Sequence, residues 1–283
     1  MSLQLDLVFL ILLAALAHAA WNALIKSSGN AILTFAMLRV VALVGGATGA
    51  LFVPVPDAAA WPYLVASAIV HNLYYLLVLY SYRHGDMSLV YPIARGGAPA
   101  LVVVAAIPFA GEIPGPSGLL GIALISAGIF AIAFARGTPR GADAIAIGLA
   151  VATTVSIVAY TLIDGLGARL SGDALGYAAW LFVLESLPFV VYAAGWRAWA
   201  LVEHARREWP RGLGGGLMMM LTYGLVIYAF TQGPLAYVSA LRETSILFAA
   251  LIGAVALKES FGPRRIAAAL VIVAGILLLQ LGG

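Results

Sequence analysis

The sequence predicts an all-α integral membrane protein whose ten transmembrane helices form two inverted five-helix repeats around a central cavity. The composition is 63% hydrophobic and 10% charged, with a mean hydropathy of +1.04, whereas a soluble domain carries about 25% charged residues. Apolar runs of about 20 residues, enough to cross a bilayer as a helix, recur along the whole chain. The segment from Tyr80 to Gly128 also resembles the segment from Tyr228 to Gly275, which indicates an internal repeat.

The apolar runs give the elements in order. A bilayer core offers no water to backbone N–H and C=O groups, so a spanning segment must satisfy them internally as a helix. The alternating pattern of a transmembrane strand is absent from these runs. Ten helices are expected, at residues 3–25, 31–53, 61–82, 87–108, 116–135, 144–166, 174–196, 211–231, 234–256 and 265–281. Residues 196–211 form the longest polar connection between them.

The repeat is defined by polar and glycine landmarks rather than by its aliphatic residues. Each glutamate of the pair Glu112 and Glu259 lies sixteen residues before a glycine of an Ala-Gly-Ile motif. Landmarks at matched spacing indicate duplication. The other matched pairs are Tyr80 with Tyr228, Gly85 with Gly233, Val90 with Val238, and Gly128 with Gly275.

Ten spans divided by a duplication give two halves of five, which we place at residues 1–138 and 139–283. Because five is odd, the second half must enter the membrane upside down relative to the first. Inverted repeats of this kind are common in secondary transporters, whose sites lie near the midplane between the halves.

Several classes of protein are disfavoured by what the sequence lacks. It has no cysteine, so disulfides and thiolate metal sites are excluded, and we expect no metal and no cofactor. It has no Walker-type phosphate loop, so uphill transport would be driven by a gradient or a partner rather than by ATP hydrolysis in this chain. A net charge of +3 is too small and scattered to suggest nucleic acid. The first apolar run lacks a basic segment before it, so we expect a retained helix rather than a signal peptide.

The basic residues predict an orientation. Eleven lie in the loops on the side opposite the termini, and only Arg169 lies on the terminal side. The positive-inside rule therefore places both termini outside the cytoplasm. The eleven are Lys26, Arg83, Arg136, Arg140, Arg197, Arg206, Arg207, Arg211, Lys258, Arg264 and Arg265.

Polar side chains within spans are costly and usually face the interior of the bundle, so they are the candidate substrate-binding residues. Trp21, Tyr82 and Tyr160 have the alternative of belonging to the interfacial aromatic belt, and the histidines could simply pack between helices. The candidates are His18, Trp21, Asn22, His71, Tyr75, Tyr82, Tyr91, Arg95, Tyr160, Tyr223, Arg242 and Glu243.

Three charged candidates are the hardest to explain by packing alone. Arg95, Arg242 and Glu243 lie about ten residues into their spans, too deep to reach the surface easily. In the repeat, Arg95 is matched by Glu243, so opposite charges should lie at equivalent depths. We expect Glu243 to neutralise Arg95 or Arg242 and to leave one positive charge for a carboxylate. The alternative is a purely structural ion pair that holds the halves together. Glu112 and Glu259, at helix ends, are expected to tether loops or cap helices.

These features resemble the drug/metabolite transporter superfamily, in particular its EamA-type ten-helix members. The matching residues are HAAWNALIK from His18 to Lys26 and SALRETSILFAALIGAVALKE from Ser239 to Glu259. The resemblance implies a multi-pass secondary transporter of the bacterial inner membrane, whose two inverted halves enclose a central cavity. Characterised relatives are largely exporters of amino acids and other small metabolites. The resemblance also implies cytoplasmic termini, which the charge bias of this sequence opposes.

Taken together, the residues and the resemblance favour a monomeric exporter of small amphipathic metabolites, above all amino acids, working by alternating access within the lipid bilayer. Carriers of phosphorylated metabolites, nucleotide-linked metabolites or cationic drugs are the alternatives within transport. A lipid-modifying membrane enzyme would need clustered acids or histidines, and a channel would need a selectivity filter. Neither pattern is present, so we do not expect an enzyme.

Overall fold

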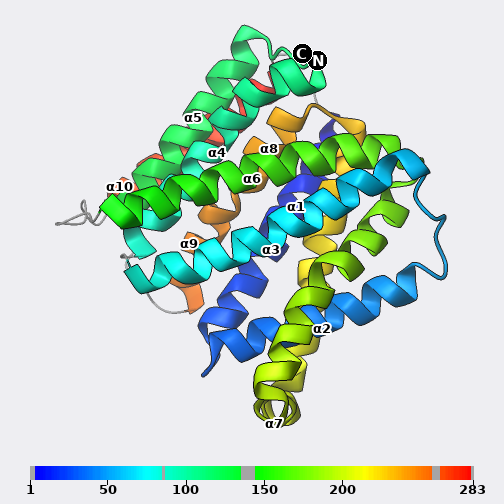
Figure 1. The fold of residues 1–283 in the computed structure, drawn as a ribbon. Helices are drawn as coiled ribbons and strands as arrows, with labels where there is room; N and C mark the ends of the chain where they lie inside the picture. Colours follow the sequence, from blue (N-terminus) through cyan, green and yellow to red (C-terminus); the bar gives the residue numbers. More distant parts are fainter. Residues whose placement is uncertain (1–3, 85–86, 135–143, 257–261, 282–283) are drawn as a thin grey trace.

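The computed structural model describes residues 4–84, 87–134, 144–256 and 262–281, and every regular element in these ranges is helical (Figure 1). Eight segments are long and apolar enough to cross a membrane, and two shorter apolar segments lie in α4 and α5. The chain is therefore a multi-pass membrane protein. The helices are α1 Leu5–Lys26, α2 Ala31–Gly49, the short 3₁₀ helix η1 Ala58–Ala60, α3 Trp61–His84, α4 Met87–Ala110, α5 Pro116–Ala133, α6 Ala144–Leu170, α7 Ala174–Gln232, α8 Leu235–Glu243, α9 Ser245–Ala256 and α10 Pro263–Leu281.

Helix α7 departs from the expected pattern because it contains two spans in one continuous helix of 59 residues. Adjacent residues of α2 contact its two limbs: a Cβ placed on Gly46 would lie 2.8 Å from Phe182 Cβ, and one on Gly45 would lie 2.6 Å from Met220 Cε. In a straight helix Phe182 and Met220 would be about 57 Å apart. Helix α7 must therefore bend back on itself between these contacts.

The prediction of a polar connection at residues 196–211 is thus wrong, since this segment is helical. Its Ala, Leu, Glu and Arg residues are strong helix formers. Two ion pairs at helical spacing add support, Arg207 with Glu203 and Arg211 with Glu208. Pro210 lies inside the helix, and proline is a usual cause of a helix bend.

The single helix expected at 234–256 is instead divided into two helices, because α8 ends at Glu243 and α9 begins at Ser245. At the junction the Thr244 backbone N–H donates to Leu241 O at 3.1 Å, and the Thr244 hydroxyl donates to the same carbonyl at 2.6 Å. The side chain and a tight turn thereby satisfy a carbonyl at the end of α8. The break places Arg242 and Glu243 in the last turn of α8.

Helices α5 and α10 pack together through contacts that are reciprocal under the repeat. A Cβ on Gly128 would lie 2.5 Å from Ile272 Cγ1, and one on Gly275 would lie 2.8 Å from Ile125 Cγ1. Gly128 and Gly275 are matched repeat positions, and at the same offset Ile125 matches Ile272. Small residues allow this close approach of backbones in a membrane.

The connections that precede α2 and α7 are also alike. Both carry a Ser-Gly-Asn/Asp-Ala sequence, ending at Ala31 and Ala174. Asn30 caps α2 by accepting from Leu33 N at 3.1 Å, and Asp173 caps α7 by accepting from Gly176 N at 2.6 Å. The start of α1 and the end of α10 lie at the same end of the molecule (Figure 1), as an even number of crossings requires.

Candidate functional site

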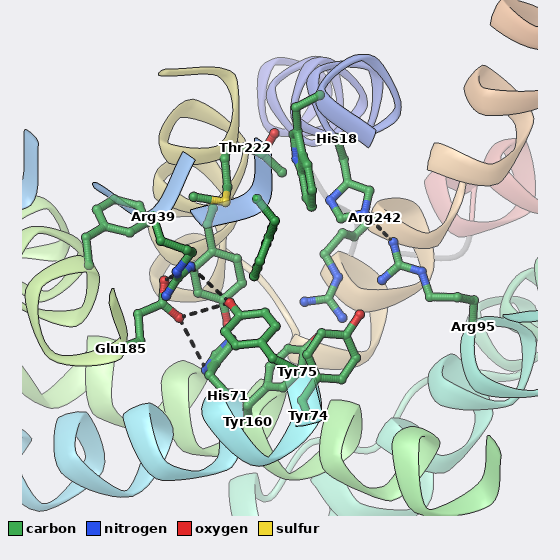
Figure 2. Close-up of a pocket in the computed structure, with 15 residues that line it drawn as sticks. His18, Arg39, His71, Tyr74, Tyr75, Arg95, Tyr160, Glu185, Thr222 and Arg242 are labelled. Atoms are coloured by element: carbon green, nitrogen blue, oxygen red, sulfur yellow. Dashed lines mark hydrogen bonds and ion pairs between the residues drawn. The ribbon is translucent and has the colours of Figure 1, made fainter. Parts of the chain in front are cut away.

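A small cavity opens between the helices, and mainly aromatic and charged side chains surround it (Figure 2). Its volume is ≈ 80 Å³, which holds water but is smaller than the roughly 150 Å³ cavity known to bind benzene. The lining residues come from α1, α2, α3, α4, α6, α7 and α8. They are His18, Trp21, Phe35, Arg39, His71, Tyr74, Tyr75, Arg95, Tyr160, Phe182, Glu185, Met219, Thr222, Tyr223 and Arg242.

One wall carries an ionic cluster formed by Arg95, Glu243 and Arg242. Glu243 Oε2 lies 3.0 Å from Arg95 Nε, and Glu243 Oε1 lies 3.1 Å from Arg242 Nη2. The Glu243 side chain is fully buried, and both arginines are nearly so. The expectation that Glu243 neutralises an arginine is confirmed, and it contacts both. The cluster thus holds two formal positive charges and one negative charge.

His18 extends this cluster on the α1 side. Its Nε2 lies 2.7 Å from Arg95 Nη2. A guanidinium can only donate, so Nε2 must accept, and His18 is neutral with its proton on Nδ1. The ring also meets Trp21 edge-on, with centroids 4.9 Å apart. His18 therefore fixes the direction of Arg95 without adding a charge.

The opposite wall carries a second, electrically neutral pair of charges, Arg39 on α2 with Glu185 on α7 (Figure 2). Arg39 Nη1 donates to Glu185 Oε1 at 3.0 Å and to the Tyr75 hydroxyl at 3.1 Å. His71 Nδ1 lies 3.8 Å from Glu185 Oε2 and 3.1 Å from Ser67 O. Ser67 Oγ also lies 3.1 Å from Nδ1, so Ser67 positions the His71 ring through both its hydroxyl and its carbonyl. The four side chains lock α2, α3 and α7 together at the cavity.

Aromatic rings form the surface between the two charged walls. Tyr160 stacks on His71 with centroids 4.2 Å apart, and Tyr74 meets Tyr160 edge-on at 5.8 Å. The Arg242 guanidinium lies 5.4 Å from the Tyr160 ring centroid, within the range of a cation–π contact. The site therefore offers π faces close to a positive charge.

Eight of the twelve predicted site residues line this cavity, although their part in binding stays a prediction. Asn22 does not, because its Nδ2 donates to His18 O at 2.8 Å within its own helix. Glu243 lies behind the two arginines that it pairs with. The side chains of Tyr82 and Tyr91 lie outside the described part of the structure. The remaining eight are His18, Trp21, His71, Tyr75, Arg95, Tyr160, Tyr223 and Arg242.

The other lining residues are not among the twelve predicted. Arg39, Glu185 and Tyr74 stand out in the sequence as polar side chains within apolar spans, which often mark a site, but the predicted set does not include them. Nothing in the sequence distinguishes Phe35, Phe182, Met219 or Thr222 from ordinary residues of a membrane helix.

The expected tethering by a glutamate at a helix end is confirmed for Glu112; Glu259 lies outside the described residues. Glu112 Oε1 pairs with Arg169 Nη2 at 2.7 Å, and Glu112 Oε2 accepts from Leu235 N, at the start of α8, at 2.7 Å. Arg169 also donates to Phe230 O and Gly233 O, each at 2.8 Å. These contacts tie the end of α4 to α6 and to the α7–α8 connection.

The site has the chemistry of a binding pocket. Across the described residues, no group of three or more histidine, aspartate or glutamate side chains is placed to hold a metal ion. The available contacts are a positively charged wall, π faces and a neutral ion pair. In proteins, groups of these kinds interact favourably with carboxylates and with apolar or cationic side chains.

Comparison with known proteins gives a family match over the second half of the chain and a fold for nearly all of it. Residues 144–281 match the model of the EamA-like transporter family. A solved crystal structure superposes with a TM-score of 0.79, covering 98% of this chain and 97% of that one at 17% sequence identity. At that identity the likeness shows the fold alone. No curated protein sequence matches the chain.

Proposed function

We propose that this multi-pass membrane protein exports amino acids or similar amphipathic metabolites, because residues 144–281 match the model of the EamA-like transporter family. The export would proceed by alternating access through the cavity, as a monomer in the inner membrane of a bacterium.

The observation that carries the proposal is the charge imbalance of the Arg95–Glu243–Arg242 cluster. Two arginines share a single glutamate at 3.0 and 3.1 Å, so these three side chains carry a net charge of +1. Arg242 lines the cavity with Tyr160 beside it. A carboxylate entering the cavity would complete the neutralisation through charge-assisted hydrogen bonds. A phosphorylated substrate would need two or more uncompensated cations, which Glu243 disfavours.

The rest of an amino acid finds partners on the facing surfaces. The rings of Tyr74, Tyr75 and Tyr160 suit an apolar, aromatic or cationic side chain. Glu185, held by Arg39 and near His71, is the acceptor on the opposite wall for an ammonium group. A substrate with a carboxylate and an amine therefore matches the two walls better than one with a single charge.

The cavity is too small at ≈ 80 Å³ for such a molecule in the described conformation. Side chains or helices must move apart to admit it. We propose that residues 1–138 and 139–283 are inverted repeats that move against each other, with Pro92, Gly96, Gly97 and Pro99 of α4 as hinges. The reciprocal packing of Gly128 and Gly275 and the matched helix caps before α2 and α7 support this arrangement.

Counterflow in proteoliposomes tests the proposal. Vesicles loaded with unlabelled L-phenylalanine should accumulate labelled L-phenylalanine transiently. Phenethylamine, which lacks the carboxylate, and 3-phenylpropionate, which lacks the amine, should compete weakly. The Arg242→Gln variant should lose discrimination between L-phenylalanine and phenethylamine. Saturable exchange for none of a panel of aromatic, aliphatic and basic amino acids would refute the proposal.

A further inference from the structure

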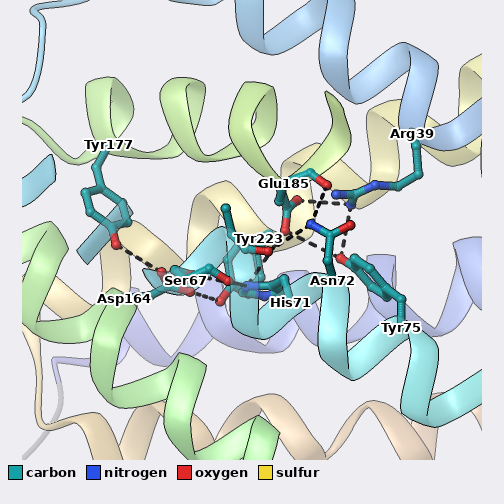
Figure 3. Close-up of polar contacts among 10 residues, drawn as sticks. Arg39, Ser67, His71, Asn72, Tyr75, Asp164, Tyr177, Glu185 and Tyr223 are labelled. Carbon is teal, nitrogen blue, oxygen red and sulfur yellow. Dashed lines mark hydrogen bonds and ion pairs between the residues drawn. The ribbon is translucent and has the colours of Figure 1, made fainter. Parts of the chain in front are cut away.

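Asp164 on α6 is a buried carboxylate that the substrate site does not use. Its side chain is fully buried, and no ion pair to it is found among the described residues. Two tyrosine hydroxyls satisfy it instead: Tyr177 donates to Oδ1 at 3.0 Å, and Tyr223 donates to Oδ2 (Figure 3). An ionisable residue of this kind within a membrane span is rare and usually functional.

The groups around Asp164 come from each packed element. Helix α3 presents His71, whose ring centroid lies 5.3 Å from that of Tyr223, and Ser67, whose hydroxyl lies 3.1 Å from His71 Nδ1. Helix α7 presents Tyr177 and Tyr223, and Glu185 lies beyond His71 at 3.8 Å. On α6 itself Tyr160 lies one turn away. Helix α8 meets α6 through Leu235 at Gly165 and through Arg242, which donates to Thr161 at 3.4 Å but is paired with Glu243. Among the described residues, no arginine or lysine forms an ion pair with Asp164, and its polar neighbours on α3 are His71 and Ser67.

The position of Asp164 links the cavity to one membrane surface. Tyr223 and His71 line the cavity. Asp164 lies six residues before the end of α6 at Leu170, and Tyr177 lies three residues after the start of α7 at Ala174, about 9 Å and 5 Å along their helices. Both helix ends lie on the side of the termini. Tyr223, Asp164 and Tyr177 therefore form a hydrogen-bonded series from the cavity towards that side (Figure 3).

We propose that Asp164 is the proton-binding site of this transporter, and that its protonation is communicated to the substrate through Tyr223. The coupling rests on the proposed function, whereas proton binding itself does not. In the ionised form both carboxylate oxygens accept from tyrosine hydroxyls. When a proton from the terminal side binds, the carboxyl gains one O–H donor and loses an acceptor. No other bond is made or broken, and the proton is released again when Asp164 ionises.

The consequence falls on Tyr223 when the proton is bound at Oδ2, because that oxygen then donates where it formerly accepted. The Tyr223 hydroxyl then accepts from the carboxyl, and its own hydrogen is freed to turn towards the cavity. Protonation would thus exchange a Tyr223 donor bound to Asp164 for a donor available to a substrate carboxylate. Binding of the proton and binding of the substrate are linked through one hydroxyl, and the linkage must be reciprocal.

Proton binding can be tested on the purified protein without any substrate. An infrared difference spectrum between mildly alkaline and mildly acidic pH should show the carbonyl band of a protonated carboxyl group. The band should disappear in Asp164→Asn, shift in Asp164→Glu, and persist in Glu185→Gln and Glu243→Gln. The proposal is overturned if the wild type shows no such band, or if Glu185→Gln or Glu243→Gln removes it while Asp164→Asn leaves it.

Coupling is tested in vesicles that contain a pH-sensitive dye. Net efflux of L-phenylalanine by the wild type should move protons in a fixed ratio. Asp164→Asn should keep L-phenylalanine counterflow, which needs no net proton movement, and lose substrate-driven proton movement at least tenfold. Counterflow without proton movement in the wild type would refute the coupling and leave the proposed function intact. Absence of counterflow with an intact infrared band would refute the proposed function and leave the proton site.

Discussion

Removing the Glu243 charge should destabilise the protein strongly, because Glu243 pairs with two buried arginines at once. Glu243→Gln removes both ion pairs, of 3.0 and 3.1 Å, and leaves the two cations facing a neutral side chain. At an effective dielectric constant of about 20, each pair attracts by about 5.5 kcal/mol before the cost of desolvation. Breaking a buried pair typically destabilises a protein by about 3–5 kcal/mol, and we expect a loss in this range.

Double variants separate the effect of charge from that of side-chain shape, since the net charge of the cluster is +1 in the wild type and +2 in Glu243→Gln. Adding Arg95→Gln or Arg242→Gln returns it to +1. Each double variant should therefore be more stable than Glu243→Gln alone, by about 1–3 kcal/mol, the usual range of coupling energies for residues in contact.

Unfolding by denaturant in mixed micelles measures these differences. Glu203→Gln is the matched control, because its ion pair with Arg207 is exposed at the surface and should contribute less than about 1 kcal/mol. If the destabilising effects of Glu243→Gln and Arg95→Gln simply add in the double variant, the cluster is not held together by its charges.

Three further predictions concern packing, substrate choice and the surface contact. Gly128→Val and Gly275→Val should each lower the thermal midpoint of unfolding clearly and by similar amounts, because the added side chain would meet Ile272 or Ile125. Gly148→Val is the control, because a Cβ at Gly148 has nothing within 4 Å. A difference between the first two variants would contradict the reciprocal packing. In counterflow, Tyr160→Ala should weaken competition by L-phenylalanine more than competition by L-alanine. The difference between the two should be roughly tenfold or less, given the size of one aromatic contact. Equal effects on both would show that Tyr160 does not contact the substrate side chain. Arg169→Gln should lower the free energy of unfolding by only about 1 kcal/mol in the same denaturation assay, because the Arg169 side chain is 31% exposed. A loss as large as that of Glu243→Gln would contradict the small contribution assigned to this surface contact.

Much of the fold follows from the sequence, since the bilayer leaves apolar runs few options besides helices. The departures occur where local interactions decide. Residues 196–211 are polar enough to suggest a connection, but their helix formers and ion pairs keep α7 continuous. The break at Thr244 depends on hydrogen bonds to Leu241 that no hydropathy pattern contains. The repeat says which spans correspond, but it does not say where one of them is interrupted.

The site was partly predictable for a related reason. Charges deep in spans are informative on their own, so Arg95, Arg242 and Glu243 could be singled out together. The pairing of Arg39 with Glu185 depends on how α2 packs against α7, which the sequence does not reveal. Asp164 was visible as a polar residue of its span, but its two tyrosine donors come from the two limbs of α7. Only the bend in that helix brings Tyr177 and Tyr223 together around one carboxylate.

Among the described residues, three arginine–glutamate contacts join the proposed halves, and they differ in how much it costs to break them. Arg95 with Glu243 and Arg39 with Glu185 are almost completely buried, so separating either pair would cost about 3–5 kcal/mol. Glu112 and Arg169 are partly exposed, at 15% and 31%, and water can replace much of their interaction for about 1 kcal/mol or less. A movement of one half against the other should therefore keep the two buried contacts and release the surface contact. We therefore expect the pivot of the movement to lie beside the cavity and the opening to lie on the side of Glu112. The hydrogen-bonded series through Asp164 and Tyr177 runs towards the same side.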